Sequence, residues 1–136
     1  DRYHAAVIAM GSNINSADNF DKALGHLQQI GFIMQRSSFI KTEPLKFEEQ
    51  PEFLNGAILL HTTKSLSELN RHLKQIEALL GRVRTENKNA PREIDLDVTT
   101  YNGFIVDQDF AEFPFLIEFV QQLQPEIQLD NSVLNR

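Results

Sequence analysis

The sequence contains no cysteine and no long apolar run, and both absences narrow what the protein can be. Without cysteine there are no disulfides, no thiol chemistry and no zinc–thiolate site. No apolar stretch approaches the roughly 20 residues of a membrane-spanning helix, and the amino terminus shows no signal-peptide pattern. We therefore expect a cytoplasmic chain that has no membrane partner.

Positive charge is also scarce. The chain carries 13 lysines and arginines against 19 aspartates and glutamates, which gives a formal net charge of −6. This balance argues against a general nucleic-acid binder, because such proteins are usually basic. No His, Lys or Arg occurs between Arg92 and Arg136. A protein of this composition that handles phosphates must concentrate its cations locally.

The length of 136 residues and a hydrophobic fraction of 41% are typical of one folded domain. We expect a single domain over residues 1–136, which acts as a monomer. Apolar periodicity and turn residues predict where its elements lie. Strands are expected at 5–10, 32–40, 53–60 and 93–101, helices at 20–30, 66–80 and 114–124, and loops at 42–52 and 82–90.

Local signals support three of these boundaries. Ser65 and Glu68 form a capping box that opens the second helix. Asn102-Gly103 is a hairpin signal that leads into a short strand at 104–106. Gly11-Ser12-Asn13 is turn chemistry that ends the first strand.

The order strand, helix, strand, strand, helix, strand is typical of an α+β protein with a ferredoxin-like βαββαβ sandwich. In that fold an antiparallel sheet carries two helices on one face, here followed by a short C-terminal hairpin and helix. The other face, with its loops, is free to hold ligands. The fold alone does not fix a function.

The fourth strand carries the strongest chemical signal, Asp95 and Asp97. Alternate strand residues face the same way, so the two carboxylates should share one face while Ile94, Leu96 and Val98 anchor the other. Adjacent carboxylates repel each other unless a cation lies between them. Magnesium fits, because it takes one or two protein carboxylates and completes its shell with water and phosphates. The alternative is a solvated edge strand whose aspartates face water.

Positively charged residues are concentrated in the loop before this strand and at the start of the strand. Arg82, Arg84 and Lys88 lie in the loop, Arg92 opens the strand, and Glu77 lies near the end of the preceding helix. Arginine binds phosphate oxygens in bidentate fashion and magnesium neutralises the rest, so this segment suits a magnesium–polyphosphate complex. An ordinary solvated charged loop would have the same composition.

Phe53 and Asn55 offer a second tool, because they share one face of the third strand. The aromatic ring can stack on a flat heterocycle while the Asn55 amide reads its edge. Phe53 as plain core is the competing interpretation.

Taken together, these segments resemble the 6-hydroxymethyl-7,8-dihydropterin pyrophosphokinase family of folate biosynthesis. They occur in the family's order and close to its spacing, over residues 5 to about 100. The matching segments are Ala9-Met10-Gly11-Ser12-Asn13, Thr42-Glu43-Pro44-Leu45, Gln50-Pro51-Glu52-Phe53-Leu54-Asn55, Ile76-Glu77 with Gly81-Arg82-Val83-Arg84, and Pro91-Arg92-Glu93-Ile94-Asp95-Leu96-Asp97.

The resemblance implies an ATP-dependent transferase that moves pyrophosphate from ATP to the hydroxymethyl oxygen of the reduced pterin and releases AMP. It implies that Asp95 and Asp97 hold two magnesium ions and that they carry catalysis together with Arg82 and Arg92. The implied ATP-binding residues are Glu77, Arg82, Arg84, Arg92 and Val98. The implied pterin-binding residues are Thr42, Glu43, Leu45, Phe53, Asn55 and Phe115.

The sequence departs from the family after Asn102. The family continues with a histidine and an arginine that serve ATP, whereas residues 107–115 here are acidic and hold no cation. An aromatic residue of the family's loop is also replaced, by Lys88-Asn89-Ala90.

Three functions therefore stay open: an active and divergent pyrophosphokinase, a non-catalytic pterin- or nucleotide-binding module, and another magnesium-dependent reaction on a flat heterocycle.

Overall fold

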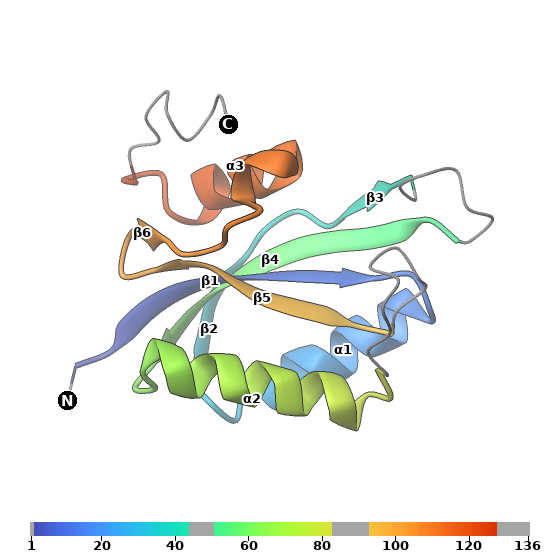
Figure 1. The fold of residues 1–136 in the computed structure, drawn as a ribbon, viewed down its shortest axis with the longest axis horizontal. Coiled ribbons are helices and arrows are strands. Elements are labelled where there is room, and N and C mark those ends of the chain that lie inside the picture. Colours follow the sequence, from blue (N-terminus) through green and yellow to red (C-terminus); the bar gives the residue numbers. More distant parts are fainter. Residues whose placement is uncertain (1, 44–50, 83–92, 128–136) are drawn as a thin grey trace.

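The computed structural model describes residues 2–43, 51–82 and 93–127, and its helices and strands follow the predicted order. Figure 1 shows them as one sheet between two layers of helices. The elements are β1 His4–Ser12, α1 Ser16–Leu27, β2 Phe32–Arg36, β3 Ile40–Thr42, β4 Phe53–Thr62, α2 Leu66–Leu79, β5 Asp95–Tyr101, β6 Phe104–Ile105, a 3-10 turn η2 Phe110–Glu112 and α3 Pro114–Leu123.

The sheet has the order β2-β4-β1-β5-β6, with β3 also paired to β4, and its pairings are antiparallel. β4 and β1 form the central pair of the sheet. They are flanked by β2, which follows α1 in the chain, and by β5, which follows α2. This is the predicted ferredoxin-like α+β topology, and it is confirmed. β1 is a nearly continuous apolar run because it lies in the middle and is covered on both faces.

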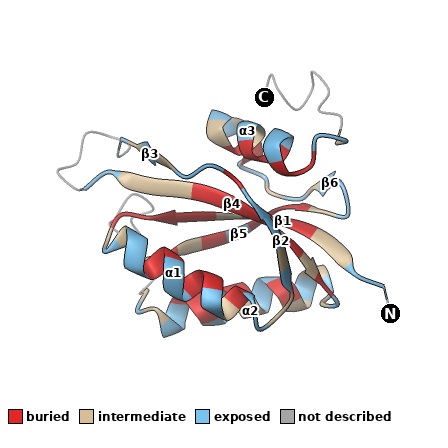
Figure 2. Cartoon of the chain, turned by 180° about the vertical axis from the view of Figure 1, so that it is seen from behind, coloured by how far each residue is buried: buried red, intermediate tan, exposed pale blue. Residues whose placement is uncertain are grey.

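Two helices, α1 and α2, cover one face of the sheet and enclose the larger core (Figure 1). Figure 2 shows the buried residues gathered on the sides of the strands and helices that face each other. The capping box predicted at the start of α2 is present, with Ser65 Oγ accepting from the Glu68 N–H at 3.2 Å. Buried members of this core include Ile8, Phe20 and Leu69.

The opposite face is not left free, which corrects one expectation. Helix α3 packs on it and buries a second core around Phe110, Phe119 and Leu123 against Val7 and Ala57 of the sheet. The cause is the apolar face of α3, which would otherwise meet water. Among the described elements, α3 covers only part of this face (Figure 1).

Several boundaries differ from prediction. The single strand expected at 32–40 is two strands separated by residues 37–39, where the Ser37 hydroxyl accepts from the Ala57 N–H at 2.8 Å and the Ser37 N–H donates to the Ala57 carbonyl at 2.9 Å. Phe39 packs on Phe20 beside Gly56, where any Cβ would clash with the Phe39 ring.

β1 runs through Ser12 instead of ending before Gly11. The first helix is earlier, at 16–27, and Thr42 belongs to a strand rather than to a loop.

The predicted hairpin at Asn102-Gly103 is present, and both residues have positive φ, 50° and 85°. Such angles favour asparagine and glycine. Within the described residues, no helix combines the length and the apolar character that crossing a bilayer would need.

Candidate active site

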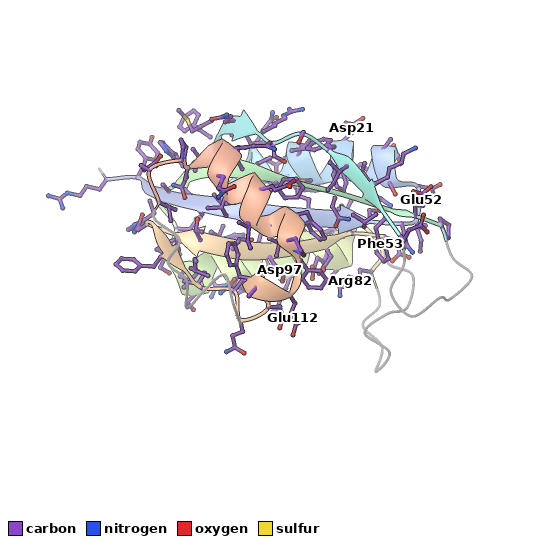
Figure 3. All side chains as sticks on the ribbon, turned by 90° about the horizontal axis from the view of Figure 1, so that it is seen from above. Asp21, Glu52, Phe53, Arg82, Asp97 and Glu112 are labelled. Atoms are coloured by element: carbon purple, nitrogen blue, oxygen red, sulfur yellow. The ribbon has the colours of Figure 1, made fainter. Side chains whose placement is uncertain are left out.

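Strand register brings the candidate residues onto one face and one end of the sheet. Asn55 of β4 pairs with Gly11 of β1, and Gly11 pairs with Asp95 of β5. In the next row on the same face, Ala9 pairs with Asp97. The amide and the two carboxylates therefore line one surface. Between them lies β1, whose side chains at these two positions are the hydrogen of Gly11 and the methyl group of Ala9. Figure 3 shows Asp97, Arg82 and Phe53 toward the same end of the sheet.

The alternation predicted for β5 is present. Ile94, Leu96 and Val98 are buried in the core under α1 and α2, while Asp95 and Asp97 face the other side. The burial of the apolar residues fixes the register, because a slip by one residue would bury the carboxylates. Val98, predicted to contact ATP, turns its side chain into this core, so only its backbone remains for a nucleotide.

A buried ion-pair cluster joins α2 to β5. Arg82 Nη1 donates to Glu77 Oε2 at 2.8 Å, to Asp95 Oδ1 at 2.6 Å and to the carbonyl of Ile94 at 3.3 Å. Glu77 Oε2 also accepts the backbone N–H of Leu96 at 2.8 Å. Glu77, predicted near the nucleotide, is thus a buried residue that ties the helix to the strand beneath Asp95.

Negative charge is concentrated around Asp97. Partial desolvation and then the charges of Asp95, Glu77 and Asp107 raise the pKa of Asp97 to about 7. The pKa of Asp107 is also raised, by desolvation first and then by Asp109, Asp95 and Glu112. Like charges disfavour ionisation, so this surface favours the arrival of a cation.

These donors fit magnesium. Asp95 and Asp97 present hard carboxylate oxygens on one face, and magnesium often binds one or two carboxylates plus phosphates and water. Within residues 2–43, 51–82 and 93–127, no group of three or more His, Asp or Glu side chains could hold a metal alone. Two carboxylates are enough for a metal whose other ligands are phosphates and water.

The other end of the row is neutral. Asn55 Nδ2 donates to Thr42 Oγ1 at 2.6 Å, and Thr42 pairs with Phe53 across β3 and β4. A Cβ on Gly11 would lie 3.1 Å from Asn55 Oδ1, so glycine leaves room for the amide. Phe53 is half-buried and Glu43 is exposed. The amide of Asn55 is thereby oriented before any ligand binds.

The remaining predicted residues are Phe115 and several that are not described. Phe115 is half-buried in the first turn of α3, with its ring centre 5.5 Å from that of Phe113 and 5.8 Å from that of Phe119. Leu45, Arg84 and Arg92, all predicted to bind substrates, lie outside the described residues, as does Lys88.

Two residues were missed by sequence reasoning. Gly11 was predicted as a turn residue within a segment that matches the family, and its place between Asn55 and Asp95 in the sheet was not predicted. Asp107 was counted in an acidic tail, although the hairpin at 102–103 returns the chain and brings its charge to Asp97. The hairpin signal, followed by a count of residues along the returning strand, could have placed Asp107 there.

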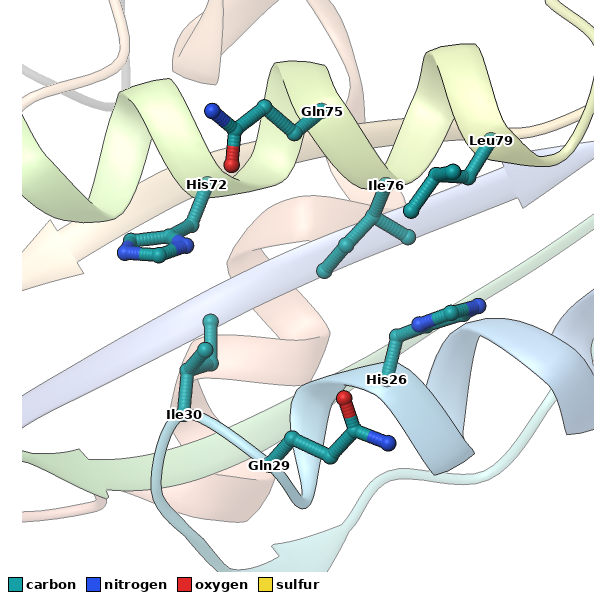
Figure 4. Close-up of a pocket in the computed structure, with 7 residues that line it drawn as sticks. All are labelled: His26, Gln29, Ile30, His72, Gln75, Ile76 and Leu79. Carbon is teal, nitrogen blue, oxygen red and sulfur yellow. The ribbon is translucent and has the colours of Figure 1, made fainter.

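A groove of about 260 Å³ lies between α1 and α2, away from the aspartates. Figure 4 shows that His26 and His72 come from different helices, with Ile76 between them. Two histidines do not complete the three or four ligands of a zinc-type site. This groove contains none of the candidate residues.

The fold and the candidate site together define a class: a ferredoxin-like α+β protein with two aspartates side by side on one face of its sheet. Solved structures agree with the fold. Plasmodium falciparum HPPK-DHPS with pteroate matches with a TM-score of 0.59 over 99% of this chain and 34% of that chain, at 15% identity.

Sequence comparison then identifies the family. The model of the 7,8-dihydro-6-hydroxymethylpterin-pyrophosphokinase family matches residues 7–125, and the chain belongs to this family. The 2-amino-4-hydroxy-6-hydroxymethyldihydropteridine pyrophosphokinase of Bacillus subtilis is 37% identical over 133 residues, which are 94% of this chain and 79% of that protein.

Other relatives are much longer. The folate synthesis bifunctional protein of Arabidopsis thaliana is 39% identical over 114 residues, 82% of this chain. The match covers 24% of that protein, and it covers 16% and 15% of the related folic acid synthesis proteins of Dictyostelium discoideum and Schizosaccharomyces pombe. The chain thus spans a quarter or less of these relatives.

Proposed function

We propose that the chain transfers pyrophosphate from ATP to 6-hydroxymethyl-7,8-dihydropterin, with magnesium bound at Asp95 and Asp97. The hydroxymethyl oxygen forms a bond to the β-phosphorus of ATP. The bond from that phosphorus to the oxygen bridging the α-phosphate breaks, so AMP leaves and the hydroxyl proton is released. The observation that carries the proposal is the cross-strand row Asn55–Gly11–Asp95 with Asp97 beside it.

The row has the dimensions that the reaction needs. Neighbouring strands lie about 4.8 Å apart, so the backbones of Asn55 and Asp95 are separated by about 10 Å. A bicyclic pterin whose edge is read by Asn55 would span β1 and bring its hydroxymethyl arm to the aspartates. Gly11 leaves the intervening surface open, and Phe53 supplies an aromatic face at the pterin end.

The chemistry suits the charged end. Phosphoryl transfer depends on alignment and charge neutralisation more than on a protein nucleophile. Magnesium, when bound, would neutralise the charge of the phosphates. Asp95 and Asp97 would hold it, and Arg82 lies beside them to stabilise phosphate oxygens. Arg84 and Arg92, from the segment before β5, would complete the ATP site.

A weaker function has one observation in its favour. Between Arg92 and Arg136 the sequence holds no cation, and Asp107 adds negative charge beside Asp97. Each charge-assisted contact that the triphosphate loses costs about 1.5–3 kcal/mol. The alternative is therefore a catalytically weak or inactive relative that binds pterin or nucleotide.

The deciding experiment measures AMP release from ATP with 6-hydroxymethyl-7,8-dihydropterin, with and without magnesium. We expect AMP only when all three are present. No AMP at high protein concentration would contradict the proposal. Pterin binding measured by calorimetry in that case would favour the binding module.

Compartment and assembly stay predictions. We expect a monomer in the cytoplasm that binds small-molecule substrates and no nucleic acid, although the related bifunctional protein of Pisum sativum is described as mitochondrial.

A further inference from the structure

Glu77 is a buried charge for which the proposed reaction has no direct use. It is 2% exposed, in the last turn of α2. A carboxylate this deep is costly unless it is paired and hydrogen-bonded. Its partners are Arg82 and the backbone N–H of Leu96, both at 2.8 Å. Leu96 lies between Asp95 and Asp97, so Glu77 holds the backbone that spaces the two aspartates.

Arg82 is held at both of its ends. Its backbone N–H donates to the Glu77 carbonyl at 3.0 Å, and its Nη1 reaches the Glu77 carboxylate. The same Nη1 contacts Asp95 Oδ1 at 2.6 Å, on one of the two carboxylates proposed to hold the cation. One guanidinium nitrogen thus serves two carboxylates, one buried and one on the ligand face.

We propose that Glu77 is a positioning residue that keeps Arg82 as an exchangeable counter-charge for Asp95. This inference rests on the proposed cation site at Asp95 and Asp97. Before the cation arrives, Arg82 neutralises Asp95. When a cation binds, Arg82 leaves Asp95 but stays paired with Glu77, and its guanidinium remains beside the metal and the phosphates.

The arrangement sets how the cation binds. A bare divalent ion must displace Arg82 from Asp95, which lowers its affinity. A cation that carries phosphates gives the displaced guanidinium a new anionic partner, so the loss is offset. Arg82, which Glu77 keeps at the site, thereby makes the site favour the metal–nucleotide complex over the bare ion.

Binding of Mn²⁺ without nucleotide tests this directly, by calorimetry on the full chain. The variants are Arg82→Met, Glu77→Gln and both together. We expect Arg82→Met to raise Mn²⁺ affinity about tenfold, which is the scale of one charge-assisted hydrogen bond. We expect Glu77→Gln to lower it, and to do so by a larger factor when Arg82 is present than in the Arg82→Met background.

Lys22→Met is the matched control. It also removes one positive charge, but Lys22 pairs with Asp18 on the surface of α1 at 3.0 Å, so Mn²⁺ affinity should stay unchanged. The double variant leaves no unpaired buried carboxylate and protects the test if Arg82→Met does not fold. Its affinity should exceed that of Glu77→Gln alone by more than the roughly tenfold gain expected for Arg82→Met.

The outcomes separate the two proposals. Equal Mn²⁺ affinity with and without Arg82, or the same Glu77→Gln factor in both backgrounds, would overturn the inference while the metal site stands. Unchanged Mn²⁺ binding in Asp95→Asn would overturn the metal site itself.

Discussion

The two ends of the candidate site differ in how their polar groups are satisfied. At the proposed pterin end, Asn55 and Thr42 are neutral and already hydrogen-bonded at 2.6 Å. At the proposed phosphate end, the pKa of Asp97 is raised to about 7 by desolvation and by three neighbouring carboxylates, with Arg82 bound to Asp95. Under the proposed function, one end is formed in advance, whereas the other would be completed by a cation. The predictions below test that contrast.

The largest effect is expected at the phosphate end. Asp95→Ala or Asp97→Ala removes half of the protein's metal donors, and AMP release should fall at least about 100-fold. Folding should persist, because both carboxylates face the ligand side. Asp18→Ala is the control, since Asp18 is a surface carboxylate on α1. Wild-type turnover in either site variant, with folding checked by circular dichroism, would contradict the metal role.

The second effect belongs to the pterin end. Phe53→Ala should weaken pterin binding by about 1–3 kcal/mol, the scale of stacking on an aromatic side chain, and should leave ATP binding nearly unchanged. Calorimetry with each ligand measures this. Phe104→Ala removes a ring that is 75% exposed on β6 and serves as the control. Equal losses for pterin and ATP would argue against stacking.

A smaller effect is expected at Thr42. Thr42→Val removes the acceptor of Asn55 Nδ2 but keeps the shape, so pterin affinity should fall by about 1–2 kcal/mol. Thr42→Ser restores the hydroxyl and should restore most of the affinity. If valine and serine bind pterin equally, the hydroxyl does not orient Asn55.

The smallest effect concerns stability and pH. The pKa of Asp97 rises from an ordinary 3.8 to about 7 in the folded protein. The folded state therefore holds this proton more tightly, and stability is lost as pH rises from about 4 to 7. Without metal, Asp97→Asn should flatten the pH dependence of the melting temperature in that window. Parallel curves for both proteins in chelator would show that desolvation and the neighbouring carboxylates do not raise the pKa of Asp97 in the folded protein.

Much of the fold followed from local patterns. The capping box at Ser65, the hairpin at Asn102-Gly103 and the two faces of β5 were all predicted, because each depends on residues close in sequence. The break between β2 and β3 was not predicted, since Ser37 bonds to Ala57 across the sheet. The covering of the second face by α3 was missed for the same reason.

The sequence alone determined the family signature, the element order and the alternation that places Asp95 and Asp97 on one side. These depend on side-chain period and on residue identity. Only the tertiary structure decided that Gly11 lies between Asn55 and Asp95. It also decided that the buried Glu77 accepts a hydrogen bond from the Leu96 N–H and that Arg82 forms an ion pair with Asp95. Register and burial are set by contacts between residues far apart in the chain, and local sequence carries no record of those distances.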